Sequence, residues 1–160
     1  MPGVRLLPAD AIAATAVAAR AAPRKRSNWN LHSSLEDPIQ RFVNVFQPET
    51  YVRPHRHEPD RFELFVALAG LAGILVFSEE GAPTGIWLIG GSENRGIDIA
   101  GGVWHTVVGL APDTVLFEVK PGPYRPLSDK DFAFWAPAEG TPEADAMVTR
   151  WGSLVSGSRG

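Results

Sequence analysis

The sequence contains no cysteine, which excludes disulfide bonds and thiolate metal ligands. It also has no long run of Lys and Arg, and its formal net charge is −3, so we do not expect nucleic acid as a partner. No apolar stretch reaches the roughly 18–20 residues of a membrane span, so we expect no membrane insertion. The lack of cysteine fits the cytoplasm, which is the location we predict.

The 160 residues favour one domain with a hydrophobic core of its own. We expect an N-terminal helix and linker over residues 1–23, a main domain over residues 24–140, and a C-terminal helix or tail over residues 141–160. The alanine-rich start could be mistaken for a signal peptide. A proline, an aspartate and an arginine interrupt it, however, and alanine favours a helix over residues 8–21. A short closing helix is expected over residues 142–154.

Between these helices the sequence is typical of antiparallel β structure. Short apolar runs are separated by proline, glycine and aspartate turn signals. The expected strands lie near residues 41–47, 51–57, 62–68, 72–78, 85–90, 95–100, 103–109 and 114–120. Many short strands at regular spacing predict an all-β sandwich or barrel.

The strongest chemical signal is a pair of histidines, His55 and His57, two residues apart. On an extended chain alternate side chains point to the same side, so both imidazoles would enter one space. A Pro-Asp turn signal separates them from Glu63, and a Gly-Gly turn signal precedes His105. Imidazole and carboxylate ligands suit a divalent metal ion, so we predict a site of three histidines and Glu63, with Glu58 as the alternative carboxylate.

The same residues resemble two known motifs. The spacing of His55, His57, Glu63 and Gly70 resembles the first motif of the cupin superfamily, and residues 101–105 resemble the second. This resemblance implies the cupin double-stranded β-helix, a jelly-roll barrel, to which the N-terminal helix and the short C-terminal helix are added. The likeness extends over residues 24–140 to the WbuC family of cupin-fold metalloproteins. It rests on five blocks in the order of that family, at residues 28–32, 37–41, 53–57, 117–124 and 129–133.

The WbuC resemblance implies a role in sugar or polysaccharide metabolism, because the family is named after O-antigen gene clusters. The cofactor would be one divalent ion, iron, zinc, nickel or manganese. Three interpretations stay open: an isomerase-like or epimerase-like step on a sugar or sugar-nucleotide-related molecule, an iron(II)-dependent dioxygenase, and metal-assisted binding without turnover. The expected partner is a small molecule, a carbohydrate or a carboxylate. A homodimer is expected, because cupins often pair through exposed sheet edges.

Two arginines and one glutamate are further candidates for the site. Arg53 shares its side of the chain with His55, and Arg53 and Arg41 would hold a substrate carboxylate or phosphate. An ordinary surface ion pair is the alternative for both. Glu118 is a candidate catalytic base or a partner for a ligating histidine, whereas a structural ion pair with Lys120 is the alternative.

Three polar residues complete the candidates. Asn30 and His32 alternate with apolar neighbours, so they would line the mouth of a pocket or bond to buried backbone. Tyr124 follows a proline-rich turn and would cover the pocket. All three are predicted to bind substrate.

Overall fold

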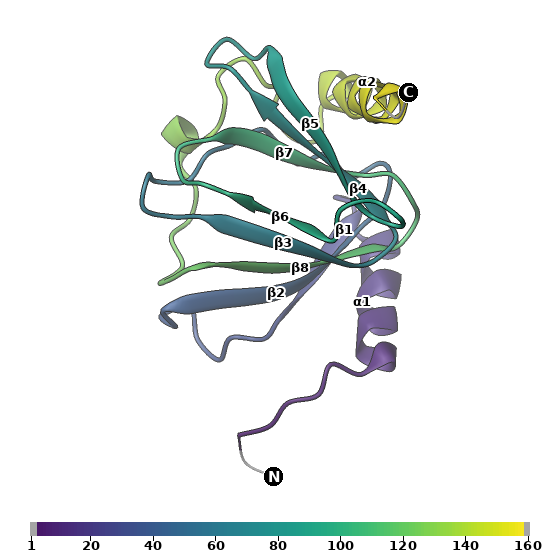
Figure 1. Ribbon diagram of the computed structural model, residues 1–160, viewed down its shortest axis with the longest axis vertical. Helices are drawn as coiled ribbons and strands as arrows, with labels where there is room; N and C mark the ends of the chain where they lie inside the picture. The colour runs from purple at the N-terminus through teal and green to yellow at the C-terminus, as the bar shows by residue number, and fades with distance from the viewer. Residues whose placement is uncertain (1–2, 159–160) are drawn as a thin grey trace.

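The computed structural model describes residues 3–158 of the chain; residues 1–2 and 159–160, the tips of the two expected terminal segments, lie outside this description. Within residues 3–158, eight strands form two antiparallel sheets that face each other (Figure 1). The five-stranded sheet has the order β1 (Arg26–Asn30), β2 (Ile39–Phe46), β8 (Thr114–Pro121), β3 (Glu63–Ala69), β6 (Gly96–Ile99). The three-stranded sheet has the order β5 (Pro83–Gly90), β4 (Leu71–Phe77), β7 (Trp104–Gly109). The prediction of a jelly-roll sandwich is confirmed.

The space between the sheets is apolar at one end and polar at the other. On β8, Leu116 packs in the cluster of apolar side chains between the sheets, and Glu118 and Lys120 follow at intervals of two residues. Because side chains alternate along a strand, these three point to the same interior side. Phe46 and Asn44 on β2 show the same change from apolar to polar. The interior of the sandwich therefore has an apolar core at one end and buried polar and ionisable side chains at the other.

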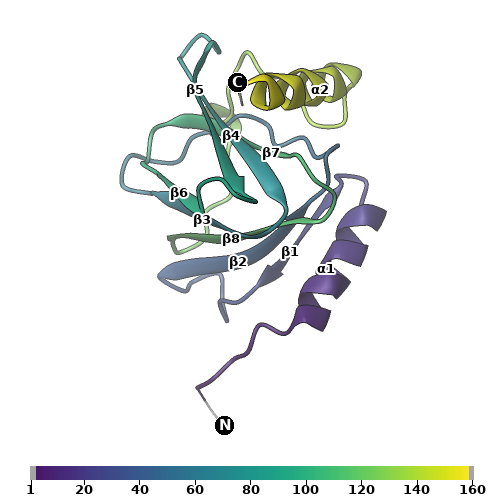
Figure 2. The ribbon, with the colours of Figure 1, turned by 45° about the vertical axis from the view of Figure 1, so that its right-hand side comes forward.

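Two helices cover the outer faces of the two sheets (Figure 2). Helix α1 (Ala9–Ala21) buries Ala16 and Ala19 against the five-stranded sheet. Helix α2 (Pro142–Gly157) packs on the three-stranded sheet with the side chains of Ala144, Val148, Trp151 and Val155. Both helices agree with the ranges that the sequence predicts, although α2 runs three residues further.

The start of α2 follows from its sequence. Thr141 is the N-cap, and its hydroxyl oxygen accepts a hydrogen bond from the backbone N–H of Ala144. Pro142 occupies the first helical position, where its missing N–H has no bonding partner to lose. The helix therefore begins at a position that both residues favour.

The prediction of a strand over residues 51–57 is wrong. His55 makes isolated bridges to His105 on one side and Phe132 on the other, and no continuous ladder forms. Pro54 has no backbone N–H, so it cannot donate to a neighbouring strand. Backbone bonds alternate instead, from His55 N to His105 O and from Arg56 N to Asp131 O.

Strand β1 was not expected, and its sequence explains why. Arg26–Asn30 carries one apolar side chain among polar ones, so the alternation that marks a half-buried strand is missing. The strand forms at the edge of the five-stranded sheet, where it pairs only with β2.

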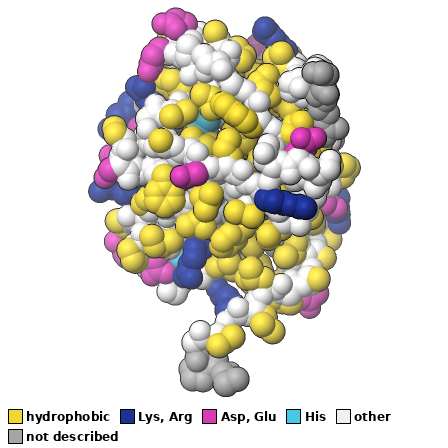
Figure 3. Space-filling model, in the orientation of Figure 1, with side chains coloured by type: hydrophobic (Ala, Val, Ile, Leu, Met, Phe, Trp, Pro, Cys, Tyr) yellow, Lys and Arg dark blue, Asp and Glu magenta, His cyan; other side chains and the backbone are white. Residues whose placement is uncertain are grey.

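One apolar surface lies at the edges of both sheets. Hydrophobic side chains gather across the middle of the face that Figure 3 shows. Residues of β5 and β6, among them Trp87 and Ile97, line a shallow apolar hollow. No helix within residues 3–158 combines the length and the apolar character that a bilayer crossing requires.

Candidate metal centre

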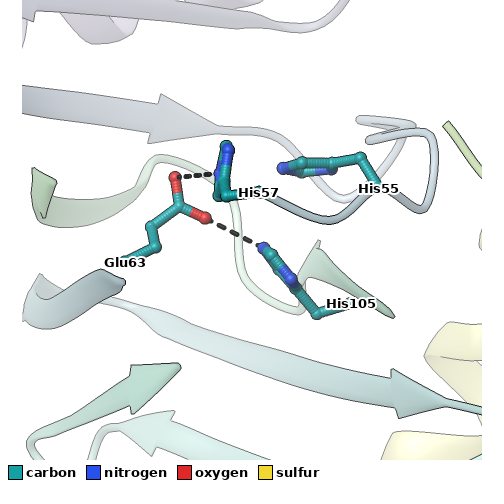
Figure 4. Close-up of side chains that lie close together, drawn as sticks. All are labelled: His55, His57, Glu63 and His105. Carbon is teal, nitrogen blue, oxygen red and sulfur yellow. Dashed lines mark hydrogen bonds and ion pairs between the residues drawn. The ribbon is translucent and has the colours of Figure 1, made fainter. Parts of the chain in front are cut away.

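His55, His57, Glu63 and His105 come together at the polar end of the sandwich (Figure 4). Each offers one ligand atom, and these atoms all lie within 4.8 Å of one another. Figure 4 shows the carboxylate of Glu63 between the imidazoles of His57 and His105. The sequence predicted this set, and the structure assembles it from three separate parts of the chain.

Local backbone structure explains how the four residues meet. His105, the second residue of β7, exchanges two backbone hydrogen bonds with His55, at 3.0 and 3.1 Å. After His57 the chain reverses in a tight turn, in which Arg61 N donates to Glu58 O at 2.9 Å. Glu63 then begins β3 and points inward on the same side as Phe65, which packs in the core.

Backbone carbonyl groups fix the orientation of two of the imidazoles. Nδ1 of His55 lies 3.0 Å from Arg53 O, and Nδ1 of His105 lies 2.8 Å from Val103 O. A carbonyl oxygen only accepts, so each Nδ1 carries the proton and donates it. The two Nε2 atoms are then left for the centre, which is the arrangement that orients histidines in metal sites.

The charges in the cluster depend on one another. Burial opposes ionisation of Glu63, but Lys120, His105 and His57 together hold the pKa of this carboxyl well below its usual value. Burial also lowers the pKa of His105, yet the hydrogen bond and the charge of Glu63 outweigh it and raise this pKa overall. Burial and the neighbouring His105 lower the pKa of His55 to about 3, so His55 is neutral at physiological pH.

Lys120 is part of the site, although the sequence predicts it only as an ion-pair partner of Glu118. Its ammonium lies 3.0 Å from Oε1 of Glu63 and 2.6 Å from Oε1 of Glu118. Glu118 also accepts a hydrogen bond from the side-chain amide of Asn44. Burial and the charge of Glu63 raise the pKa of Glu118 to about 7, and Lys120 opposes this rise. The structural ion pair of Glu118 with Lys120, one of the two alternatives for Glu118, is therefore present. Lys120 in turn links Glu118 to Glu63 in the histidine cluster.

The residues present fit a divalent metal ion. The cluster offers three imidazoles and one carboxylate, a nitrogen and oxygen set that suits zinc, iron, nickel or manganese. Nε2 of His57 is buried and makes no hydrogen bond within residues 3–158, although it lies 3.4 Å from Oε1 of Glu63. A buried imidazole nitrogen without a hydrogen bond is unfavourable, and a metal ion at this position would satisfy it.

Glu58, the alternative carboxylate, lies outside the cluster. Its Oε2 atom is 3.1 Å from Nε of Arg61 and 2.7 Å from Nη1 of Arg125. The side chain is 43% exposed, whereas that of Glu63 is 3% exposed. The geometry therefore favours Glu63 as the carboxylate ligand.

A cavity of about 400 Å³ opens beside His55 and His57. Of the predicted substrate-binding residues, Tyr124 lines it. The cavity lining does not include Arg53, Arg41, Asn30 or His32.

Three of those four residues, Arg53, His32 and Asn30, have other observed contacts. The guanidinium of Arg53 lies over the ring of Phe132, 5.2 Å from its centre. His32 is buried, and its Nδ1 accepts a hydrogen bond from the backbone N–H of Arg41 at 3.1 Å, which ties the segment after β1 to β2. Asn30 is bonded by the side chain of Asn28, and together they line a shallow hollow beside α1. The sequence leaves two roles open for His32, at the mouth of a pocket or bonded to buried backbone, and the structure shows the bond to backbone.

A family model described as a domain of unknown function, DUF6016, matches residues 7–89. The chain belongs to the DUF6016 family. The match includes His55, His57 and Glu63 and ends before His105, so it spans part of the candidate site. No curated protein matches this DUF6016 chain by sequence.

Solved structures support the fold of this DUF6016 protein. The plu4264 protein from Photorhabdus luminescens superposes with a TM-score of 0.51 and 18% identity over 76% of this chain and 89% of its own. CapF has a TM-score of 0.55 and 19% identity over 66% of this chain. Procruciferin, the 11S globulin of Brassica napus, has a TM-score of 0.50 and 13% identity over 64% of it. The match spans only 30% of CapF and 26% of procruciferin. At these identities the likeness concerns the fold alone, and that fold is the cupin jelly roll.

Proposed function

We propose that this chain is a divalent-metal-binding cupin that acts on, or binds, a small molecule related to sugars or sugar nucleotides. The observation that carries the proposal is the buried cluster of three histidines and Glu63, with Nδ1 of His55 and His105 already held by backbone carbonyl groups. A divalent ion bound there would act as a Lewis acid on a carbonyl or hydroxyl group of the ligand. The cavity beside His55 and His57 gives a small molecule access to this point.

The residues of the chain have separable roles in this proposal. His55, His57, His105 and Glu63 hold the ion. Lys120 keeps Glu63 ionised and oriented, because its ammonium contacts Oε1 of that carboxylate at 3.0 Å. Membership of the WbuC family and a role in polysaccharide metabolism belong to the same proposal and rest on the resemblance of the sequence blocks. The homodimer and the cytoplasmic location remain predictions.

Elemental analysis of protein purified without chelators, with oxygen excluded in parallel, tests this function. We expect one equivalent of a divalent metal per chain. Stoichiometric iron would favour the alternative of a small-molecule dioxygenase, whereas zinc, nickel or manganese would favour isomerase-type chemistry or binding without turnover. Protein that carries no metal and takes none up would refute all three.

The variant His57→Ala separates a functional metal from a structural one. Since His57 is at the cavity and the core lies at the other end of the sandwich, we expect the variant to lose metal uptake and keep its circular dichroism spectrum. A metal that only holds the barrel together would give a different result. In that case both the variant and the chelated wild type would unfold at a markedly lower temperature.

A further inference from the structure

The cavity beside the proposed metal centre is rich in positive charge. Five cationic side chains line it, with two carboxylates: Arg56, Arg61, Lys120, Arg125, Lys130, Glu58 and Asp131. The whole chain has 15 Lys and Arg residues and a net charge of −3, so a third of its cations surround this one cavity. A concave wall with an excess of positive charge concentrates the electric field and attracts ligands of negative charge.

The two carboxylates of the lining are already engaged by the protein. Glu58 is bound by both Arg61 and Arg125. Asp131 accepts hydrogen bonds from the backbone N–H of Ser128 at 2.8 Å and from its hydroxyl at 2.7 Å. Lys130 makes no ion pair with any residue of the described chain, and Arg125 shares its one carboxylate. Arg56 is paired with Glu79 at 2.8 Å, and Lys120 is paired with Glu63 and Glu118. Arg125 and Lys130 are therefore the cations that remain available to a ligand.

Gln40, one of the residues that line the cavity, has a buried acceptor atom. Gln40 on β2 is 1% exposed, and its amide nitrogen donates to Asp37 O at 2.9 Å and Leu35 O at 3.2 Å. Its Oε1 atom is buried and has no hydrogen-bond partner within residues 3–158. Since a buried acceptor without a donor is unfavourable, a hydrogen bond from an O–H or N–H group of a ligand to this atom would be favourable.

The acceptor lies in line with the metal cluster. Gln40 on β2 pairs in register with Lys120 on β8. On the other side of β8, Val119 pairs with Leu64 of β3, so Glu63, the residue before Leu64, lies beside Lys120. Gln40, Lys120 and Glu63 thus form a row across three adjacent strands. One ligand could therefore reach Gln40, the metal position and the cations of the rim together.

We infer that the cavity binds a hydroxylated small molecule that carries a carboxylate or a phosphate, with its anionic group at Arg125 and Lys130 and a hydroxyl donating to Gln40. This inference rests on the proposed function for the metal position, and names the class of ligand for that site. A cavity of about 400 Å³ accommodates a molecule of the size of one or two sugar rings. The class includes sugar acids and sugar phosphates, which share the chemistry that these residues recognise.

Calorimetric titration of the metal-loaded protein with matched probes tests this inference. The probes are D-glucuronate and glucose 6-phosphate, each compared with neutral glucose. We expect at least one of the anions to bind at least about tenfold more tightly than glucose. The affinity for that anion should fall as salt is added. The anion that binds identifies the carboxylate or the phosphate as the preferred group.

The double charge reversal Arg125→Glu with Lys130→Glu should lower the affinity for the anion at least about tenfold. The double reversal Arg95→Glu with Arg150→Glu, at two exposed positions outside the cavity lining, is the control matched in charge, and should leave binding unchanged. Gln40→Met should weaken anion binding without abolishing the preference for anion over glucose. Circular dichroism checks the fold of each variant, and the rim variants stand as an independent test if Gln40→Met does not fold.

Three results would overturn the inference: neither anion binds, glucose binds as tightly as the anions, or the rim reversal has no more effect than the control. Metal content is measured separately on the same samples. Protein without metal refutes the proposed function, whereas metal-loaded protein without anion selectivity refutes only the ligand class. Titration of the metal-free protein keeps the test of the cationic rim valid in either case.

Discussion

The ammonium of Lys120 lies 3.0 Å from Oε1 of Glu63, at the position where a buried carboxylate would otherwise have only imidazoles as partners. The same ammonium contacts Glu118. In the metal-free protein Lys120 is thus the main compensation for the negative charge of Glu63, and a divalent ion would add a second one.

Lys120→Met should therefore make folding depend on metal. Breaking a buried ion pair leaves an uncompensated charge, so we expect the metal-free variant to lose about 3 kcal/mol of unfolding free energy. A bound divalent ion compensates Glu63 directly, so metal should raise the melting temperature more in the variant than in the wild type. Thermal unfolding with and without chelator measures this, with Lys130→Met as the exposed control. An equal metal effect in both proteins would contradict the role of Lys120.

Glu118→Gln should stabilise the metal-free protein at alkaline pH. The folded pKa of Glu118 is raised to about 7 from a usual value of 4.5, so its contribution to stability is full below pH 4.5 and is lost as pH rises through 7. Glutamine keeps an oxygen for Asn44 and has no charge to bury. The variant should match the wild type near pH 4.5 and exceed it by up to about 3 kcal/mol at pH 8. Urea unfolding at both pH values measures this, with the exposed Glu80→Gln as control.

Metal uptake should release protons. The pKa of His105 is raised in the metal-free protein by Glu63, and a protonated imidazole cannot bind a metal ion. Metal affinity should therefore rise as pH increases through that elevated pKa and level off above it. His55 should contribute no proton, because its pKa is about 3. Calorimetry in buffers with different ionisation enthalpies counts the released protons, and a metal that binds without releasing any would disprove this account.

Gly73 and Val155 should be energetically coupled. A Cβ atom at Gly73 would lie 2.7 Å from Cγ1 of Val155, because α2 packs directly on β4 there. We expect Gly73→Ala to destabilise the protein by about 2 kcal/mol through overpacking, and Val155→Ala by a similar amount through a cavity. The double variant should lose less than the sum of the two. Gly152→Ala, where a Cβ meets nothing within 4 Å, should be neutral or stabilising. Additive losses would show that α2 can shift away from β4.

Three of the four ligands, His55, His57 and Glu63, could be predicted because their spacing is short and local, whereas His105, 42 residues beyond Glu63, was predicted from the Gly-Gly turn signal and the resemblance of residues 101–105 to the second cupin motif. His55 and His57 share a side of the chain by parity alone, and the turn before Glu63 preserves that parity. Lys120 and Gln40 have no such signal. They meet the cluster through the pairing of β2 and β3 with β8, which joins segments far apart in the sequence. The one available hint was that Lys120 follows Glu118 by two residues.

The fold was predictable where the hydrophobic pattern was strong. Strands β4, β7 and β8 are rich in buried apolar residues, and their expected ranges agree with the structure. The error at residues 51–57 has a local cause, since Pro54 interrupts an otherwise extended segment that bonds alternately to two neighbours. Strand β1 forms because β2 supplies a partner, which a polar sequence alone does not reveal.

The position of β8 has a consequence for the order in which the molecule is made. This strand lies between β2 and β3, although it is the last of the eight to leave the ribosome. Until it is synthesised, β2 and β3 lack the neighbour that joins them, and Glu63 lacks Lys120. Pairing over such sequence separations closes slowly, because a long loop must be ordered first. The five-stranded sheet and the ion pair of Glu63 with Lys120 should therefore form late, after residue 121 has been synthesised. The core cluster that includes α2 should form later still, because it needs residues up to Val155.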